Sequence, residues 1–284
     1  MRILLTGAAG QVGYELERSL QGLGQVTALG RARMDLAKLD QVRDVIRALK
    51  PDLIVNAAAY TAVDLAESEP ALARRINAEA PDVMAQEARK LGAAMVHYST
   101  DYVFDGSKAG AYTETDRPNP LNVYGQTKLE GEQAVAAAGI DHLILRTSWV
   151  YGMRGKNFLL TMMRLARERD ELRVVSDQHG APTWSRTVAD TTAVLLARAQ
   201  QGGGSWWQQH GGLYHLGSSG QTTWAGFTEE IMAQQQMGCN VVPITSAEYP
   251  TAARRPQNSV LDCARLATLC ALPDWRDALA LCLK

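Results

Sequence analysis

The stretch LLTGAAGQVGYEL, residues Leu4 to Leu16, decides the fold class. Its three glycines, Gly7, Gly10 and Gly13, directly follow an apolar run and continue into a helical pattern. Glycines let the backbone turn tightly and approach a diphosphate closely, while the N–H groups and the dipole of a helix N-terminus attract its negative charge. The spacing is G-x-x-G-x-x-G. Its position between a predicted strand and a predicted helix indicates a dinucleotide-binding loop.

Short β-rich runs alternate with longer helical patterns over the first half of the chain. The predicted strands are Arg2 to Thr6, Gln25 to Leu29, Leu53 to Asn56, Ala94 to Thr100 and His142 to Ser148. The predicted helices between them are Val12 to Gln21, Gln41 to Lys50 and Ala71 to Leu91. Continuous apolar strands separated by helices indicate a parallel sheet covered on both faces. The predicted fold class is α/β, with a doubly wound parallel sheet formed by residues 1–150.

The pattern loosens after about Trp149. Here we expect a strand at LRVV, a mobile glycine-rich loop in which two Trp side chains cover an apolar patch, and two helices. The segments are, in chain order, Phe158 to Glu168 (helix), Leu172 to Val175 (strand), Thr187 to Gln200 (helix) and Gln200 to Gly212 (loop, with Trp206 and Trp207). Residues 151–284 are predicted to form a smaller substrate-binding lobe, with segments that return to the first domain.

Composition narrows the function further. The net charge of -1 gives no basic footprint for nucleic acid or a membrane surface, so a small-molecule substrate is expected. The four cysteines lack metal-ligand spacing and indicate small buried side chains in a reducing compartment. No apolar run approaches about 18 residues, and the chain opens with a predicted strand, so we expect a cytoplasmic protein. No metal cluster is predicted, although a magnesium ion held by surface carboxylates would leave no such signature.

The second predicted strand ends in a way that bears on the cofactor. In NAD-binding sites a carboxylate usually follows this strand and accepts hydrogen bonds from the ribose, but this chain has Gly30 there. Arg31 and Arg33 follow, and a guanidinium suits the additional 2′-phosphate of NADP. We therefore expect NADPH to be preferred over NADH. Asp35 and Leu36 are expected beside the same cofactor.

The stretch NVYGQTKLEGE, residues 122–132, places Tyr124 and Lys128 four residues apart at the start of a predicted helix. Residues with this spacing share one helix face. A nearby ammonium favours phenolate, and a lowering of the Tyr124 pKa from about 10 toward neutrality would suit a proton donor. An isolated Y-x-x-x-K is far more often an exposed aromatic beside a solvated Lys. The pair alone therefore leaves both interpretations open.

Further motifs follow the glycine loop in a fixed order: NAAAYTAVD (residues 56–64), HYSTDYVFDG (97–106), NVYGQTK (122–128) and RTSWVYG (146–152). With them the chain resembles the extended short-chain dehydrogenases, which have a Rossmann domain, and among these the family of dTDP-4-dehydrorhamnose reductases. The similarity continues through DQHGAPT, RPQNS and LPDW, and so covers essentially the whole chain. It implies reduction of dTDP-4-dehydro-L-rhamnose to dTDP-L-rhamnose by NADPH or NADH, a step in polysaccharide biosynthesis.

The resemblance also implies roles for individual residues. Tyr124 is the expected proton donor, Lys128 lowers its pKa and holds the nicotinamide ribose, and Thr100 hydrogen-bonds the substrate oxygen. The expected cofactor contacts are Gly7, Gly10, Gln11, Val12, Gly13, Arg31, Arg33, Asp35, Leu36, Ala57, Ala58, Ala59, Tyr124 and Lys128. The expected contacts of the nucleotide sugar are Thr100, Asp101, Trp149, Asn157, Gln178, Thr183 and Arg255. The fork of donors on Arg255 matches a diphosphate.

Two alternatives stay open at this stage. One is another nucleotide-sugar enzyme of the superfamily, although a dehydratase would carry a Glu where this chain has Tyr102. The other is a non-catalytic binding protein, similar to the regulatory subunit of methionine adenosyltransferase. Thr100, Tyr124 and Lys128 are all present, which favours an enzyme. The resemblance leaves monomer and homodimer open.

Overall fold

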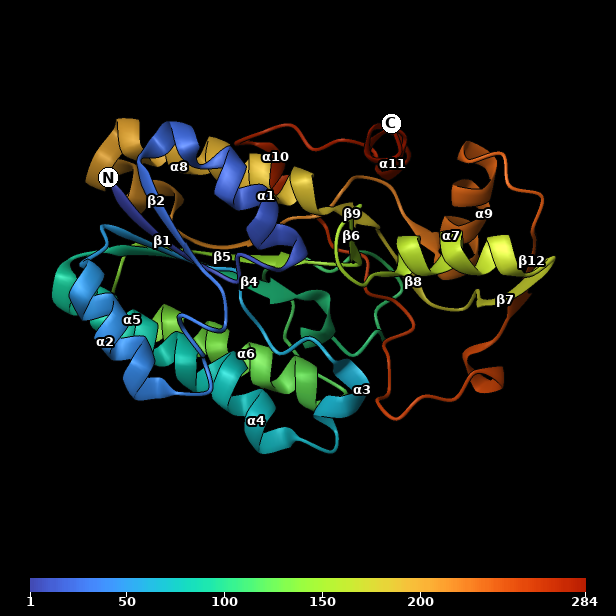
Figure 1. Cartoon of the computed structure of the whole chain (residues 1–284), viewed down its shortest axis with the longest axis horizontal. Coiled ribbons are helices and arrows are strands. Elements are labelled where there is room, and N and C mark those ends of the chain that lie inside the picture. Colours follow the sequence, from blue (N-terminus) through green and yellow to red (C-terminus); the bar gives the residue numbers. More distant parts are fainter.

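The structure, a computed structural model, describes all 284 residues. Its central sheet has six parallel strands in the order β10-β5-β4-β3-β1-β2 (Figure 1). The strands are β1 (Arg2–Thr6), β2 (Gln25–Leu29), β3 (Leu53–Asn56), β4 (Ala94–Thr100), β5 (His142–Thr147) and β10 (Gly212–His215). The first five follow the predicted runs, and the sixth comes from beyond residue 150. The predicted doubly wound α/β fold is confirmed.

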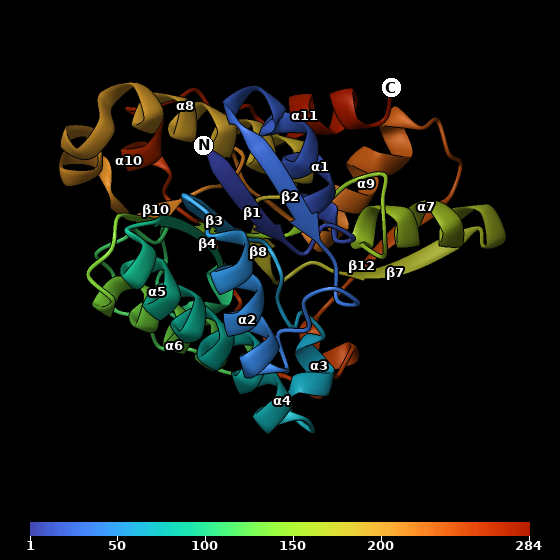
Figure 2. The same cartoon turned by 60° about the vertical axis from the view of Figure 1, so that its left-hand side comes forward.

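Helices cover both faces of this sheet (Figures 1 and 2). One layer contains α1 (Gln11–Ser19), α8 (Ser185–His210) and α10 (Ala264–Ala267). The other contains α2 (Leu39–Leu49), α3 (Val63–Ala66), α4 (Pro70–Arg74), α5 (Ala80–Leu91) and α6 (Val123–Ala137). Alternate side chains of each strand enter one layer or the other: Ile3 and Leu5 pack toward α1 and α8, and Leu4 packs toward α2 and α5. The sheet thus has an apolar core on each face, and burial of these side chains stabilises the domain.

The lobe lies beyond the carboxyl ends of the sheet strands, on the right of Figure 1. Its elements are α7 (Phe158–Glu168), β7 (Glu171–Val175), α9 (Trp224–Gln234), β12 (Asn240–Ile244) and α11 (Trp275–Cys282). Strands β7 and β12 pair in parallel, and Phe227 and Trp275 centre a separate small core. Two short pairs connect the lobe to the sheet domain: β6 (Val150–Tyr151) with β9 (Thr183–Trp184), and β8 (His179–Gly180) with β11 (Thr222–Thr223).

Single-turn helices complete the chain. Three are 3₁₀ turns, at Gln21–Leu23, Asp101–Val103 and Ser246–Glu248. The fourth is a π-helical turn, Arg75–Glu79, between α4 and α5. The helix predicted over 71–91 is therefore not one regular helix. The wide turn buries Ile76, Asn77 and Ala78, which changes the face that the following helix presents.

The prediction of a mobile loop at residues 200–212 is wrong. This stretch is the second part of α8, which continues to His210 after a break at Gly203, where φ is 57° and ψ is -143°. Trp206 is only 8% exposed and belongs to the core beneath α8, with the Trp207 ring edge-on to it at 5.1 Å. The glycines suggested mobility, but burial of the two indoles stabilises the helix.

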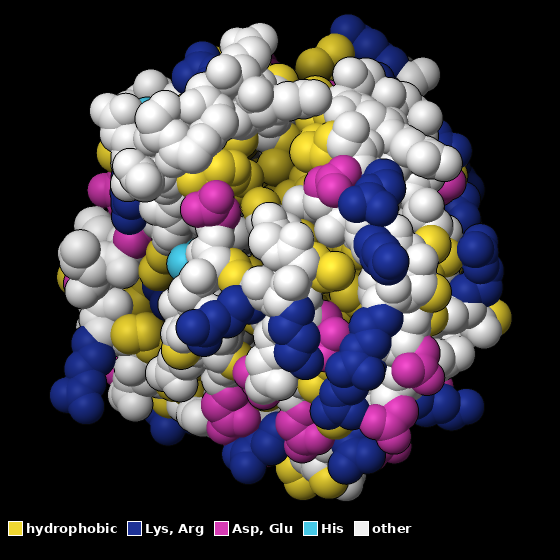
Figure 3. Space-filling model, turned by 90° about the vertical axis from the view of Figure 1, so that its left-hand side faces the viewer, with side chains coloured by type: hydrophobic (Ala, Val, Ile, Leu, Met, Phe, Trp, Pro, Cys, Tyr) yellow, Lys and Arg dark blue, Asp and Glu magenta, His cyan; other side chains and the backbone are white.

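The surface carries mixed charge. On the face shown in Figure 3, basic and acidic side chains are interspersed over the lower half, and hydrophobic side chains lie in a recess above them. None of the helices has the length and apolar character needed to cross a membrane. The four thiols are free. Only Cys282 is buried and the other three are half-buried, so the prediction that all four are buried is confirmed for Cys282 alone.

The glycine-rich loop turns sharply between β1 and α1. Gly7 has a left-handed φ of 71°, and its carbonyl oxygen accepts a hydrogen bond of 2.8 Å from the Gly10 N–H. A Cβ on Gly13 would lie 2.1 Å from the Gly7 oxygen, well inside van der Waals contact. Only glycine therefore allows α1 to begin this close to the end of β1.

We expect Gly13→Ala to lower the free energy of unfolding by about 1–3 kcal/mol, because the added methyl group displaces the Gly7 carbonyl. Gly22→Ala is the matched control, since a Cβ there meets no atom within 4 Å. Urea unfolding of the two variants makes the comparison. Equal stability of Gly13→Ala and the wild type would show that the loop does not make this close contact.

Candidate active site

The order of the strands reverses at β1, beside the loops that follow β1 and β3. Strand β1 pairs with β2 on one side and β3 on the other, so the connections diverge at this point. In doubly wound sheets ligands bind at such a position, outside the carboxyl ends of the strands. The two loops touch, because a Cβ on Gly7 would be 2.8 Å from the carbonyl carbon of Ala57. Ala57, Ala58 and Ala59 are half-buried in the loop after β3.

The first turn of α1 has the chemistry of a diphosphate site. No side chain caps it, and it carries no acidic residue. Its N–H groups are therefore available to an anion. Gln11 and Val12 are half-buried in this turn. The Gln11 side chain is engaged, because Nε2 donates to the Val150 carbonyl at 3.3 Å and Oε1 accepts from Asn157 Nδ2 at 2.8 Å. Its backbone fits a dinucleotide, whereas its side chain connects α1 to the lobe.

Arg31 and Arg33 are exposed after β2, and neither forms an ion pair. Asp35 is instead engaged in its own loop. Its Oδ1 accepts from the Ala37 N–H at 3.1 Å, and its N–H donates to Gln41 Oε1 at 3.0 Å. Leu36 is buried. The side chains that remain free at the end of β2 are thus cationic, which fits a phosphorylated ribose.

The three predicted catalytic residues come together from two elements. Thr100 ends β4, and α6 begins after Asn122, whose Oδ1 accepts from the Gly125 N–H at 2.8 Å. A Cβ on Gly125 would lie 2.1 Å from the main-chain carbonyl oxygen of Tyr102, so α6 closely approaches the turn that follows β4. Tyr124 thereby interacts with Thr100. One turn further on, Lys128 is 3% exposed and donates from Nζ to the Tyr98 carbonyl at 2.5 Å.

The predicted lowering of the Tyr124 pKa is not found. Burial raises the pKa of Tyr124 to about 12, with the Thr100 hydroxyl acting in the opposite direction. Burial also lowers the pKa of Lys128 to about 8. Lys128 has therefore lost its charge before the phenol ionises and gives the phenolate no electrostatic support at that pH. At neutral pH the site holds a neutral phenol and an ammonium ion.

Asp101 lies behind Thr100 and not toward solvent. It is buried, and its Oδ1 accepts a hydrogen bond of 3.0 Å from the Thr100 hydroxyl. Burial raises the pKa of Asp101 to about 6. The prediction that Asp101 reaches sugar hydroxyls is therefore replaced by a different role, because its carboxyl group holds the Thr100 hydroxyl. The Tyr102 N–H donates to the same hydroxyl at 3.1 Å.

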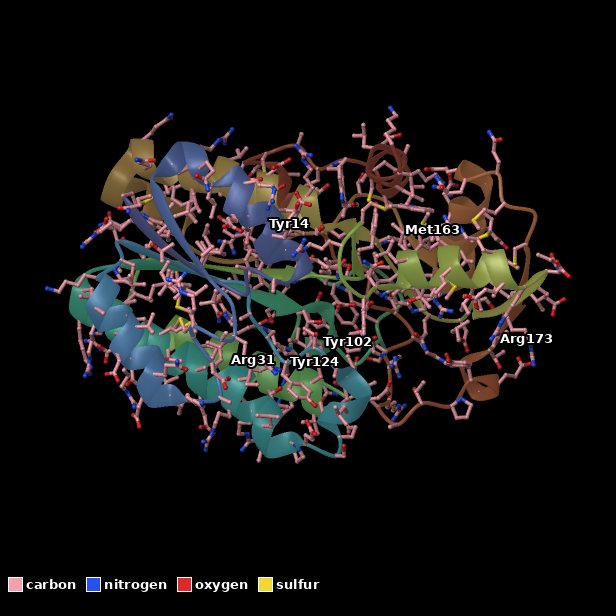
Figure 4. All side chains as sticks on the ribbon, viewed as in Figure 1. Tyr14, Arg31, Tyr102, Tyr124, Met163 and Arg173 are labelled. Atoms are coloured by element: carbon pink, nitrogen blue, oxygen red, sulfur yellow. The ribbon has the colours of Figure 1, made fainter.

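A cavity of about 1500 Å³ extends from Tyr102 into the lobe. Of the predicted substrate contacts, Gln178 and Arg255 line it. Sequence reasoning missed other lining residues, namely Tyr102, Phe158, Arg169, Arg173, Trp224 and Arg254. Figure 4 shows Tyr102 beside Tyr124 near the sheet and Arg173 at the far end of the lobe. None of Thr100, Tyr124 and Lys128 lines the cavity, which begins at Tyr102 and extends to Arg169 and Arg173 in the lobe.

Tyr102 connects the two parts of this cavity. Its ring meets the Tyr124 ring edge-on at 5.9 Å, and its hydroxyl interacts with Arg255. Arg255 also forms an ion pair of 2.7 Å with Asp64. Its guanidinium is consequently held in one direction before any ligand arrives. The position of Tyr102, directly after Thr100 and Asp101, was the available signal for its importance.

Five of the seven predicted substrate contacts do not line the cavity: Thr100 and Asp101 at the end of β4, and Trp149, Asn157 and Thr183. Trp149, with φ of 46°, stacks on Trp224 at 3.5 Å. Asn157 caps α7 by accepting from the Leu160 N–H at 3.0 Å. Thr183 is fully buried, and its hydroxyl donates to the Ala181 carbonyl at 3.2 Å. These last three side chains hold the lobe against the sheet domain. No three His, Cys, Asp or Glu side chains are grouped closely enough to hold a metal ion.

A glycine loop at the strand reversal, with a Tyr and a Lys one turn apart on the helix beside β4, defines the class of extended short-chain dehydrogenases and reductases. The family model described as the RmlD substrate binding domain matches residues 1–284. The chain belongs to this family.

Curated relatives match over nearly the whole chain. A dTDP-4-dehydrorhamnose reductase of Burkholderia thailandensis is 49% identical over 294 residues, covering 100% of this chain and 98% of the relative. A protein of the same name from Escherichia coli is 45% identical, covering 97% of this chain and 95% of the relative.

Solved structures agree. A dTDP-4-dehydrorhamnose reductase of Clostridium acetobutylicum has a TM-score of 0.91 at 36% identity, covering 100% of this chain and 98% of that one. A dTDP-4-dehydrorhamnose reductase of Bacillus anthracis, solved in complex with NADP, has a TM-score of 0.90 at 35% identity, covering 99% and 98%. A UDP-glucose 4-epimerase of Thermus thermophilus, at 19% identity and a TM-score of 0.83, shares the fold.

Burial of Lys128 has a consequence for stability. Its folded pKa of about 8 lies below the ordinary 10.5, so the unfolded chain binds more protons between these two pH values. Stability therefore rises with pH across this window. The difference between the folded and the ordinary pKa of Lys128 corresponds to a loss of about 3 kcal/mol in the free energy of unfolding at neutral pH.

We expect Lys128→Met to be more stable than the wild type at pH 7, by about 1–3 kcal/mol, because the buried ammonium is removed. The gap should narrow between pH 8 and 10.5, as the wild-type lysine loses its proton. Urea unfolding at pH 8 and at pH 10.5 measures the difference in the free energy of unfolding between the variant and the wild type. The exposed Lys38→Met is the control, and its difference from the wild type should stay constant. A gap for Lys128→Met that does not change with pH would contradict the burial cost.

Proposed function

We propose that this chain reduces dTDP-4-dehydro-L-rhamnose to dTDP-L-rhamnose with NADPH. The observation that carries the proposal is the convergence of Thr100, Tyr124 and Lys128 at the same edge of the parallel sheet as the glycine loop. The similarity to reductases of this name over the whole chain supports it. The chain is expected to act in the cytoplasm, as a monomer or as a homodimer.

Each catalytic residue has a defined task in this proposal. The bound reduced nicotinamide supplies the hydride for the C4 carbonyl carbon. Tyr124, a neutral phenol at working pH, donates its proton to the carbonyl oxygen as negative charge develops there. The Thr100 hydroxyl donates its one proton to Asp101 Oδ1 in this structure, so Thr100 orients the substrate oxygen by turning this proton toward it. Lys128 holds the nicotinamide ribose.

The cavity suits a nucleotide diphosphate sugar. Its volume of about 1500 Å³ exceeds that of a typical small-ligand pocket of roughly 300–1000 Å³. Four arginines line it, of which Arg255 is oriented by Asp64 and Arg173 by Glu248 at 2.8 Å. Planar guanidinium groups match diphosphate oxygens. We assign Arg255 to the diphosphate because it interacts with Tyr102, whose ring contacts the Tyr124 ring.

The wild-type protein should oxidise NADPH when given dTDP-4-dehydro-L-rhamnose generated in place, as followed by loss of reduced-nicotinamide absorbance. Tyr124→Phe should lower kcat by about 10²–10⁴-fold and keep its NADPH affinity, because the phenol only transfers a proton. Tyr214→Phe is the control: this buried hydroxyl donates to the His210 carbonyl, away from the site. Near-normal turnover of Tyr124→Phe would remove Tyr124 from the mechanism. Absence of wild-type turnover would overturn the proposed reaction.

Arg31 and Arg33 are expected to set the preference for NADPH over NADH. The double variant Arg31→Ala/Arg33→Ala should raise the KM for NADPH by about tenfold or more and leave the KM for NADH within about twofold. Hydrogen bonds to charged groups contribute about 1.5–3 kcal/mol, and only NADPH carries the 2′-phosphate. Arg43→Ala, an exposed arginine on α2 paired with Asp40, is the control. An equal effect on both cofactors would exclude recognition of the 2′-phosphate by these residues.

A further inference from the structure

Residues 253–255 form part of the cavity wall and include Arg255, which is assigned to the diphosphate. None of residues 250–256 belongs to a helix or strand, and none forms a hydrogen bond between main-chain groups. The groups that fix this segment are therefore side chains of other elements. Asp64 on α3 is one of them. Its Oδ1 accepts from the Ala253 N–H at 3.0 Å, and its Oδ2 pairs with the Arg255 guanidinium at 2.7 Å.

Asn122 is the second side chain that holds this segment. Its Nδ2 donates to the Arg254 carbonyl at 2.8 Å, although the two residues are 132 positions apart in the sequence. The same side chain caps the start of α6, because its Oδ1 accepts from the Gly125 N–H at 2.8 Å. Asn122 is only 7% exposed, so water competes little for either bond. One amide thus joins the cavity wall to the first turn of the helix that carries Tyr124.

An asparagine at this position does more than cap a helix. A cap needs only an oxygen acceptor, which Ser, Asp and Asn supply about equally well. The amide of Asn adds a donor nitrogen in the same planar group. Here the oxygen serves α6 and the nitrogen serves the main chain of Arg254. The planar amide therefore keeps the cavity wall at a fixed place relative to the start of α6.

Helix α3 supports the same connection independently. Asp64, which holds residues 253–255, lies on this four-residue helix, and Glu67 follows at its C-terminal end. The Oε1 atom of Glu67 accepts from the Val123 N–H at 2.8 Å, at the first residue of α6. One carboxylate of this short element therefore binds the cavity wall, and another binds the start of α6.

We propose that Asn122 is a positioning residue, which fixes the diphosphate-binding segment 253–255 relative to the proton donor Tyr124. The inference rests on the proposed function, in which Arg255 binds the diphosphate of the nucleotide sugar. Asn122 itself does not line the cavity. Tyr124 lies two residues further on, in the first turn of α6. The place of the diphosphate sets where the C4 carbonyl meets the phenol, and a displacement of about 1 Å is sufficient to lower a rate by about 10²-fold.

Binding of dTDP, measured by calorimetry, tests this role without turnover. Asn122→Ser keeps an oxygen that caps α6 and removes the amide donor to Arg254. We expect the variant to raise the dissociation constant for dTDP at least about fivefold and to leave that for NADPH within about twofold. Unchanged affinity for dTDP would overturn the proposal, because Asn122 would then only cap the helix. An equal loss of affinity for NADPH would also contradict it, since α6 as a whole would have moved.

Asp274→Ser is the matched control for this comparison. Asp274 caps α11 by accepting from the Arg276 N–H at 2.9 Å, and it does not line the cavity. The substitution therefore makes the same kind of change at the start of another helix. Its dissociation constants for dTDP and NADPH should both stay within about twofold of the wild type.

A double variant shows whether Asn122 acts through Arg255. Arg255→Ala alone should raise the dissociation constant for dTDP about tenfold, because hydrogen bonds to a charged group are lost. Asn122→Ser in that background should add less than twofold, because changes that act through one segment are not additive. Full additivity would exclude an action through Arg255.

The same binding measurements separate the proposal from the proposed function. If the wild type binds dTDP but reduces no nucleotide sugar, the proposed function fails, and the affinities of the variants still decide the role of Asn122. If the wild type reduces the nucleotide sugar and Asn122→Ser binds dTDP as the wild type does, the role of Asn122 fails alone. Absence of dTDP binding by the wild type would overturn both.

Discussion

Burial of the Lys128 ammonium beneath the end of β4 is the constraint on which the site depends. An isolated buried charge is unfavourable, and the protein surrounds this one with polar groups. The Tyr98 carbonyl accepts from Nζ, and Glu132 lies one helical turn further on. Glu132 in turn forms a buried bidentate pair with Arg146, at 2.7 and 2.8 Å. The pair fixes α6 against β5, because separating either partner would leave an uncompensated charge. The position of Tyr124 on the same helix follows from these contacts.

Much of the fold followed from local patterns in the sequence. Apolar runs separated by helical periodicity predicted five strands of the sheet, and the glycine loop was recognisable by its place after the first strand. The π turn at Arg75–Glu79 and the helical segment with Trp206 were not predictable in this way. A single inserted residue leaves no clear periodicity. Glycine content reports chain freedom, whereas the burial of Trp206 depends on the sheet core formed by distant segments.

The residues of the site were predictable from the sequence, whereas their pKa values were not. The spacing of Tyr124 and Lys128 indicates a shared helix face, but it contains no information on desolvation, which raises the pKa of the Tyr and lowers that of the Lys. Matching motifs likewise assigned Asn157 and Trp149 to substrate. In the structure Asn157 bonds to Gln11 at the start of α1, and Trp149 stacks on Trp224 of α9. Residues that a family motif assigns to substrate can therefore have a structural role instead: these two join the lobe to the sheet domain.

The raised pKa of Tyr124 and the lowered pKa of Lys128 suit the proposed chemistry. Before reaction the site holds a neutral phenol and a buried ammonium without a carboxylate hydrogen-bonded to it. In the proposed reaction, proton transfer from Tyr124 creates a phenolate one helical turn from Lys128, and the buried ammonium gains a partner of opposite charge. An interaction that strengthens toward the transition state accelerates the chemical step, whereas one present equally at the start does not. In the proposed mechanism, the desolvation of Lys128 lowers the stability of the fold and stabilises the product side of the proton transfer.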